Sequence, residues 1–130
     1  MKILLVTLIF VSTVQFSACS TTAVIPENAV TLEALDCSQE EQLKSESFEV
    51  KSRVMFTNTS SNTVALRWIN YQGERDTQPD QLVQIQPGKS TTRDTFLTHP
   101  FVVTDTAGTC LSIYLPEALP DAKINLALIK

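Results

Sequence analysis

Apolar and polar side chains alternate along residues 50–57 and again along residues 64–68. In the first segment Val54 and Phe56 fall on one face, and the residues between them fall on the other. Residues 58–62 consist only of Asn, Thr and Ser, which are typical turn formers. The pattern predicts a β-hairpin in which a polar turn joins two strands.

Five further short segments have the apolar and β-branched composition of strands. Turn signals separate them, among them the Pro87–Gly88 pair and two later prolines. The candidate strands are residues 81–86, 90–96, 101–104, 110–115 and 122–129. With the hairpin they make seven strands and almost no helix, so the sequence predicts an all-β fold, a seven-stranded antiparallel β-sandwich.

Residues 1–18 have the composition of a secretory signal peptide. Lys2 precedes an apolar stretch that is too short for a comfortable membrane span. Residues 16–19 resemble the bacterial lipobox, and this resemblance implies that Cys19 receives a lipid and becomes the mature N-terminus. We therefore expect an exported lipoprotein, held to the outer membrane by its lipid and facing the periplasm or the cell exterior. The alternative is a secreted soluble protein cleaved near residue 23.

Residues 19–42 are expected to form a lipid-anchored tether that ends in a short helical turn. The apolar residues up to Asp36 show no sustained period, which is typical of a linker. Ser38 and Glu41 form a capping-box pattern, which predicts the helical turn at residues 39–44. The globular domain is then expected to span residues 43–130.

The chain contains three cysteines, which is an odd number for an exported protein. If Cys19 is lipidated or removed with the signal, Cys37 and Cys110 remain, and an oxidising compartment would allow them to form a disulfide. A bridge across so long a loop would stabilise the fold by roughly 4 kcal/mol. Two cysteines and one histidine lack the ligand spacing of a zinc site, so no metal is expected.

Charge and motif content exclude several classes of function. The formal net charge is −4 and there is no basic stripe, so no nucleic-acid partner is expected. The single histidine has no catalytic partner at a recognisable spacing, and the three glycines are all assigned to turns. The chain is therefore not expected to be an enzyme or to hold a cofactor.

Several short motifs occur in the order and near-constant spacing found in the von Hippel–Lindau β domain. They lie at residues 54–58, 68–73, 87–88, 98–101 and 105–109. The chain resembles this family from about residue 43 to residue 129. The resemblance implies a β-sandwich that binds an extended peptide or protein segment.

In the animal protein this β domain binds a hydroxyproline-containing peptide, and a following helical domain recruits elongins to form a ubiquitin-ligase receptor. The resemblance covers only the β domain, and an exported protein would not meet a ubiquitin system. We therefore expect neither an elongin-type partner nor a ligase role.

The resemblance also implies a ligand pocket, which by alignment is only partly retained. Its candidate residues are Trp68, Leu82, Thr95, Phe96, His99 and Phe101. The indole wall and the histidine are kept, and threonine keeps the hydroxyl of a serine. The leucine and the two phenylalanines replace two tyrosines and a tryptophan, which removes polar groups from the pocket.

Two functions follow from these features. The first is a non-enzymatic binding module for an extended peptide that carries proline or hydroxyproline. The alternative is a structural envelope lipoprotein, in which the pocket residues belong only to the core. An open groove beside Trp68 favours the first, whereas a space filled by Leu82 and Phe96 favours the second.

Overall fold

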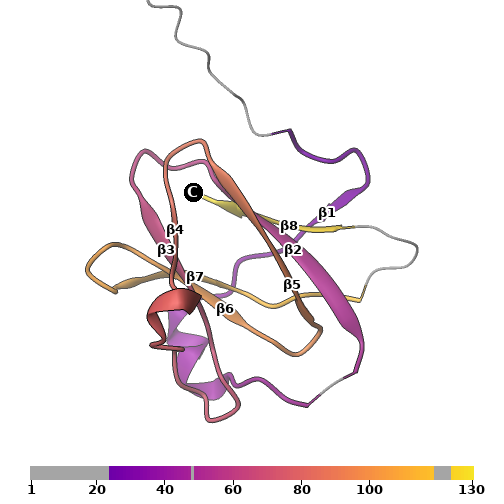
Figure 1. Cartoon of the computed structure of the whole chain (residues 1–130), viewed down its shortest axis with the longest axis vertical. Helices are drawn as coiled ribbons and strands as arrows, with labels where there is room; N and C mark the ends of the chain where they lie inside the picture. Colours follow the sequence, from indigo (N-terminus) through magenta and orange to yellow (C-terminus); the bar gives the residue numbers. More distant parts are fainter. Residues whose placement is uncertain (1–23, 48, 119–123) are drawn as a thin grey trace, which may run out of the picture.

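Two four-stranded sheets pack face to face in the computed structural model, which describes residues 24–47, 49–118 and 124–130 (Figure 1). One sheet has the strand order β1-β8-β2-β5, and the other has the order β4-β3-β6-β7. In chain order the strands are β1 (Ala29–Thr31), β2 (Lys51–Asn58), β3 (Val64–Trp68), β4 (Val83–Ile85), β5 (Ser90–Phe96), β6 (Phe101–Thr104), β7 (Cys110–Tyr114) and β8 (Ile124–Ile129). Two short 3-10 helices, η1 (Cys37–Gln42) and η2 (Pro79–Gln81), complete the described elements. The all-β sandwich expected from the sequence is confirmed.

Strand positions agree closely with the alternation in the sequence. β5 and β6 have the expected bounds, and β7 ends one residue earlier than expected. β4 is shorter than the expected segment 81–86, because Gln81 belongs to η2. Of the last expected strand, residues 122 and 123 lie outside the described residues.

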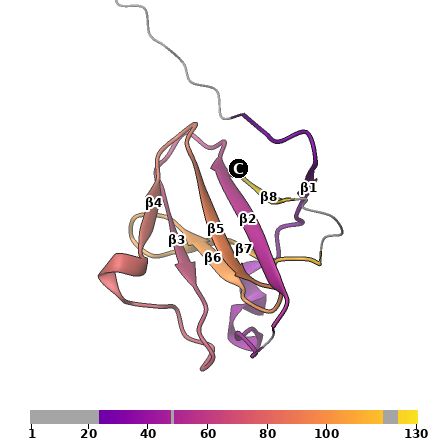
Figure 2. The same cartoon turned by 45° about the vertical axis from the view of Figure 1, so that its right-hand side comes forward.

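The expected hairpin is wrong, because β2 and β3 belong to different sheets (Figure 2). β2 lies between β8 and β5, whereas β3 lies between β4 and β6. The polar segment between β2 and β3 therefore crosses from one sheet to the other. Both strands still bury their alternating apolar residues in the shared core, so the same pattern serves either arrangement.

Asn58 holds this crossover in place from a fully buried position. Its amide nitrogen donates to the backbone carbonyls of Asn62 and Ile85, at 2.7 and 2.8 Å. Its amide oxygen accepts from the backbone N–H and the hydroxyl of Ser60, at 3.0 and 2.7 Å. The side chain thus satisfies backbone groups that an apolar residue would leave unpaired.

The sequence predicted a wholly antiparallel sandwich, and this part of the prediction is wrong. β8 pairs in parallel with both β1 and β2, and Leu126 is the register partner of both Thr31 and Met55. β1 lies within residues 19–42, which were expected to form a tether. It adds one strand to the seven that the sequence predicted. It leads into Leu32, which is 4% exposed and packs in the core. Three residues carry too short a periodic signal to predict a strand, so the tertiary contacts decide it.

Cys37 and Cys110 form a disulfide that joins η1 to the start of β7, as expected. The Cα atoms are 6.0 Å apart and the sequence separation is 73 residues. η1 begins two residues before the expected helical turn. Its N-cap is Asp36, whose carboxylate accepts from the Ser38 backbone N–H, so Ser38 is not the cap. The predicted signal peptide at residues 1–18 and the predicted lipidation site at Cys19 lie outside the described residues.

The core between the sheets centres on Phe56, which is fully buried on β2. Its ring meets Phe101 and Tyr114 edge-on, with centroid distances of 5.3 and 6.1 Å. Both partners come from the opposite sheet, so this aromatic cluster joins the two layers. The Tyr114 hydroxyl is satisfied by the Leu128 carbonyl at 2.8 Å.

Candidate functional site

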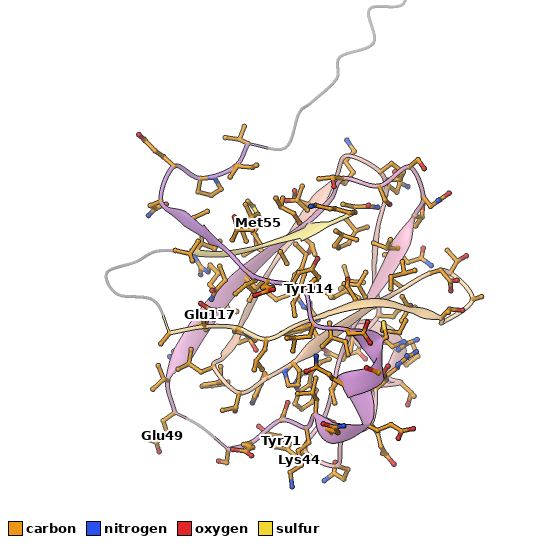
Figure 3. All side chains as sticks on the ribbon, turned by 180° about the vertical axis from the view of Figure 1, so that it is seen from behind. Lys44, Glu49, Met55, Tyr71, Tyr114 and Glu117 are labelled. Carbon is orange, nitrogen blue, oxygen red and sulfur yellow. A yellow bond between two sulfur atoms is a disulfide. The ribbon has the colours of Figure 1, made fainter. Side chains whose placement is uncertain are left out.

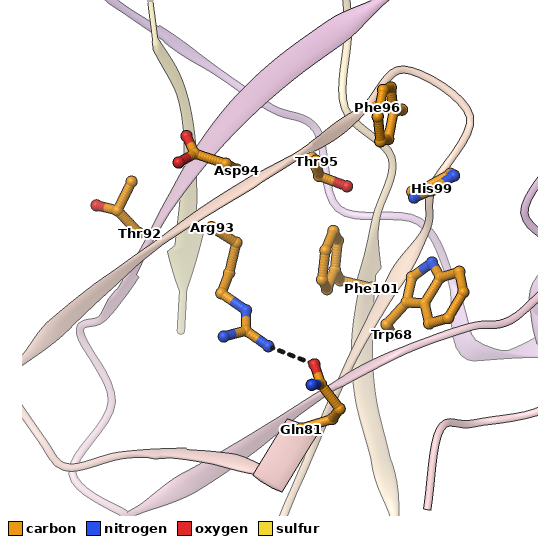
Figure 4. A pocket seen from close by; sticks show the side chains of 9 residues that line it. All are labelled: Trp68, Gln81, Thr92, Arg93, Asp94, Thr95, Phe96, His99 and Phe101. Atoms are coloured by element: carbon orange, nitrogen blue, oxygen red, sulfur yellow. Dashed lines mark hydrogen bonds between the residues drawn. The ribbon is translucent and has the colours of Figure 1, made fainter. Parts of the chain in front are cut away.

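A groove of approximately 370 Å³ lies where β5 faces the other sheet (Figure 4). β3, η2 and β6 contribute one wall, and β5 with the turn that follows it contributes the other. The residues that line the groove are Trp68, Gln81, Thr92, Arg93, Asp94, Thr95, Phe96, His99 and Phe101.

Five of the six pocket residues expected from the sequence line this groove, and Leu82 does not. η2 ends just before Leu82, and the lining residue from this segment is the preceding Gln81. The leucine expected to close the pocket is therefore replaced by an amide.

The alternation of β5 determines which of its side chains face the groove. Arg93 and Thr95 point toward Phe101, whereas Thr92 and Asp94 point to the other side of the strand (Figure 4). On that other side, the Asp94 carboxylate accepts from Arg53 Nε at 2.6 Å. This hydrogen bond lowers the pKa of the Asp94 carboxyl below its ordinary value. Asp94 therefore stays ionised at neutral pH, with its charge engaged outside the groove.

Trp68 presents its ring to the groove, while its N–H is used on the protein side. The indole Nε1 donates to the hydroxyl of Ser45 at 2.7 Å, and Ser45 in turn donates to the Ile69 carbonyl. Ser45 is 2% exposed. The indole orientation thus depends on the buried Ser45 hydroxyl. No sequence motif pointed to this serine.

His99 lies within an aromatic cluster beside Trp68. Its ring centroid is 5.3 Å from that of Trp68, 5.6 Å from that of Tyr71 and 5.2 Å from that of Phe96. The Tyr71 hydroxyl lies 3.4 Å from His99 Nε2. Burial lowers the pKa of His99 below its ordinary value, against the opposing effect of a hydrogen bond with the Glu46 backbone. The imidazole is therefore neutral at pH 7, and one ring nitrogen can donate while the other accepts.

The Thr95 hydroxyl is the unpaired polar group of the groove. The residue is 7% exposed, and its side chain makes no hydrogen bond to any residue that the structure describes. Thr57, Thr98 and Thr104, by contrast, each engage their hydroxyl in a hydrogen bond. Because the hydroxyl oxygen is not among the buried atoms, it is accessible from the groove, where a ligand or water can bind it.

The residues that follow η1 are hydrogen-bonded to the segments that carry Trp68 and His99. The Ser45 N–H donates to the Asn70 carbonyl at 3.0 Å, and the Thr98 hydroxyl donates to the Glu46 carbonyl at 2.7 Å. Gly73 has a φ of +81°, and a Cβ there would lie 3.2 Å from the Leu43 carbonyl oxygen. We call residues 43–46 the support segment. They connect the end of β3, which carries Trp68, and the turn that carries His99 to the disulfide-linked η1.

An ion pair closes the same end of the sandwich. Arg75 donates from Nε and Nη2 to the two carboxylate oxygens of Glu40 on η1, and from Nη1 to the Gly108 carbonyl. Tyr71 and Lys44 are both labelled at this end in Figure 3. The disulfide and the ion pair therefore hold η1 to the start of β7 and to the segment that follows β3.

The residues that the structure describes form neither a cluster of metal ligands nor a membrane-spanning helix. Within residues 24–47, 49–118 and 124–130, no three His, Cys, Asp or Glu side chains gather as metal ligands would. The helices formed by these same residues are too short and too polar to span a bilayer.

The fold and the groove together define a β-sandwich domain with an open site at a sheet edge. The family model for the VHL beta domain matches residues 43–114, which is more than half of the chain. The chain therefore belongs to the VHL β-domain family. This family is a non-catalytic protein-interaction domain, which fits a role without catalysis.

The solved structures to which this chain is similar include the protein elicitor MoHrip2 from Magnaporthe oryzae. The two chains are 18% identical, with a TM-score of 0.39. The match covers 55% of this chain and 51% of the elicitor, so it spans about half of that protein's length. No curated protein matches the sequence.

Proposed function

We propose that this domain is a non-enzymatic binding module that holds an extended peptide along β5 and takes a proline or hydroxyproline ring into the groove. The observation that carries the proposal is the Thr95 hydroxyl, which has no described protein partner and lies in the groove beside aromatic walls. Family membership supports a protein or peptide partner in general. The residues that line the groove favour a partner that presents a ring with a hydrogen-bonding group.

The position of β5 supports recognition of an extended chain. Among the described strands β5 pairs only with β2, and it ends the sheet. A strand at a sheet edge has backbone N–H and C=O groups free to pair with another chain. Such pairing supplies affinity through main-chain hydrogen bonds, while a side-chain pocket supplies selectivity.

The chemistry of the groove supports a saturated ring that carries a hydroxyl. Trp68 and Phe96 provide aromatic surfaces at its sides, and the 4%-exposed Phe101 provides an apolar floor. The Thr95 hydroxyl offers a donor and an acceptor to a ligand hydroxyl, whereas the His99 ring already contacts Tyr71 and the Glu46 backbone. Proline would leave the Thr95 hydroxyl without this partner, so Thr95 would favour hydroxyproline.

Peptide titration tests this proposal, because the chain contains a single tryptophan, Trp68, in the groove wall. Two peptides that differ only by proline or hydroxyproline are titrated while tryptophan fluorescence is recorded. We expect the hydroxyproline peptide to bind about tenfold more tightly. Thr95→Val removes the hydroxyl while keeping the side-chain shape, so it should abolish this preference.

Thr31→Val is the matched control, because it makes the same change at an exposed position on β1, outside the groove and at the other end of the same sheet. It should leave both affinities unchanged. Equal affinities in the wild type, unaltered by Thr95→Val, would remove hydroxyproline selectivity from the proposal. Absence of binding by either peptide would contradict the peptide-binding function itself.

The alternative function is a structural envelope scaffold. It is favoured by the use of the Trp68 N–H within the protein and by the burial of Phe101 against Phe56. In that case Thr95→Val and His99→Ala would change neither peptide binding nor the assembly of the domain with an envelope complex. The open groove and the position of Leu82 outside it favour the binding module instead.

We also propose that the protein is exported and lipid-anchored through Cys19, at the outer membrane. The Cys37–Cys110 disulfide supports an oxidising compartment. Labelling of cells with radioactive palmitate is expected to mark the wild-type protein but not a Cys19→Ser variant. Labelling of neither protein would favour the secreted soluble form, and equal labelling of both would contradict Cys19 as the site of lipidation.

A further inference from the structure

Arg93 shares the groove face of β5 with Thr95, two residues further along the strand. Its side chain extends between β5 and η2, on the side toward Phe101 (Figure 4). A strand rises about 3.3 Å per residue, so the two backbone positions are about 7 Å apart. The groove therefore has a hydroxyl at one end and a cation at the other.

The guanidinium of Arg93 has no carboxylate partner within the part of the chain that the structure describes. Its one hydrogen bond runs from Nη2 to the neutral side-chain oxygen of Gln81, at the long distance of 3.4 Å. Arg53 and Arg75, by contrast, each contact a carboxylate. Asp94, the acid next to Arg93 in sequence, is engaged by Arg53 on the opposite face of the sheet. The positive charge in the groove is thus not neutralised by the protein.

The alternation of an extended peptide determines which of its residues would meet this charge. Side chains two residues apart point to the same side of a strand. If a proline-type ring lies beside Thr95, the residue two positions away along the peptide lies opposite Arg93. A residue directly next to the ring would point away from the groove.

We propose that the peptide ligand carries a carboxylate side chain two residues from the ring residue, and that Arg93 selects for it. This inference rests on the proposed peptide-binding function and adds the charge of the ligand to it. A guanidinium binds a carboxylate through paired N–H donors, and the weak contact with Gln81 is easily exchanged for such a pair. The acidic residue lies before or after the ring residue according to the direction in which the peptide runs.

The test uses a set of capped seven-residue peptides built on alanine with one central hydroxyproline. One peptide has Glu two residues before the ring, one has Glu two residues after it, and one has Glu directly beside it. Each is paired with a peptide that has Gln at the same position. We expect one of the two peptides with the two-residue spacing to bind about fivefold more tightly than its Gln counterpart, which is the upper range for a partly exposed ion pair. The peptide with adjacent Glu should show no such gain.

Arg93→Gln should remove the fivefold gain, so that each Glu peptide binds with the same affinity as its Gln counterpart. Lys51→Gln serves as the matched control, since it removes one positive charge from an exposed position on the neighbouring strand β2 and should preserve the gain. Thermal unfolding of both variants confirms that they fold. Arg93→Glu should reverse the preference, so that a Lys peptide binds more tightly than the Glu peptide.

The outcomes separate this inference from the proposed function. Hydroxyproline-dependent binding through Thr95 with equal affinities for the Glu and Gln peptides would overturn the role of Arg93 alone. A gain that persists in Arg93→Gln would do the same. Absence of binding by every peptide would overturn both the inference and the function on which it rests.

Discussion

Replacing both Cys37 and Cys110 by serine is expected to lower the free energy of unfolding by roughly 4 kcal/mol. The bridge closes a loop of 73 residues and so restricts the unfolded chain strongly. Domains of this size are typically stable by only about 5–15 kcal/mol. Urea unfolding of the double variant and of the wild type, both at neutral pH, measures the difference.

The same change is expected to loosen the binding groove before the whole domain unfolds. The disulfide holds η1, and η1 leads into the support segment, whose Ser45 hydroxyl orients the Trp68 indole. Without the bridge, the Glu40–Arg75 ion pair is left to hold η1 to the segment that follows β3. Trp68 emission should therefore shift to longer wavelength in the folded variant, as the half-buried indole becomes more exposed to water.

The control for the disulfide prediction is Ser45→Ala with both cysteines intact. It should change Trp68 emission in the same direction while keeping the stabilisation from the bridge. A double-serine variant that unfolds within about 1 kcal/mol of the wild type would contradict the chain-entropy argument. Unchanged Trp68 emission would contradict the link between the disulfide and the groove.

Phe56→Ala is expected to destabilise the domain by about 3–5 kcal/mol. Phe56 is fully buried, and its ring contacts Phe101 and Tyr114 across the two sheets. The substitution removes apolar surface from the core and leaves a cavity between rigid strands, which cannot collapse to fill it. Chemical denaturation followed by far-UV circular dichroism measures the loss.

Phe56→Leu is the matched variant, because it keeps most of the side-chain volume and removes only the aromatic contacts. Its expected cost is about 1–2 kcal/mol. Phe96→Ala, at a half-buried groove position, should also cost less than Phe56→Ala. If Phe56→Ala is no more damaging than these two, the aromatic cluster is not the centre of the core.

Much of the fold could be predicted because strand formation leaves a local signal. Alternation located β2 and β3, and turn residues marked the ends of β5 and β6. The short strand β1 could not be predicted in this way. Its three residues form a strand because β8 lies beside them, and that neighbour is about a hundred residues away in sequence.

The candidate site was partly predictable through family resemblance. Trp68, Thr95 and His99 do gather at one groove, as the aligned motifs implied. Arg93 could have been found from the same alternation that puts Thr95 in the groove, since the two are separated by one residue. Ser45 gave no comparable signal, because a lone serine before a strand is common and its contact with Trp68 exists only in the folded chain.

By itself the sequence determined the class of the fold, the buried face of most strands, the pairing of Cys37 with Cys110 and the family. Each of these depends on local alternation, on a small number of cysteines or on motifs in a fixed order. Only the tertiary structure decided that β2 and β3 lie in separate sheets, that β8 pairs in parallel, and that Gln81 lines the groove in place of Leu82. The physical reason is that alternation specifies which face of a strand is buried, whereas its neighbours are selected by contacts between residues far apart in the chain.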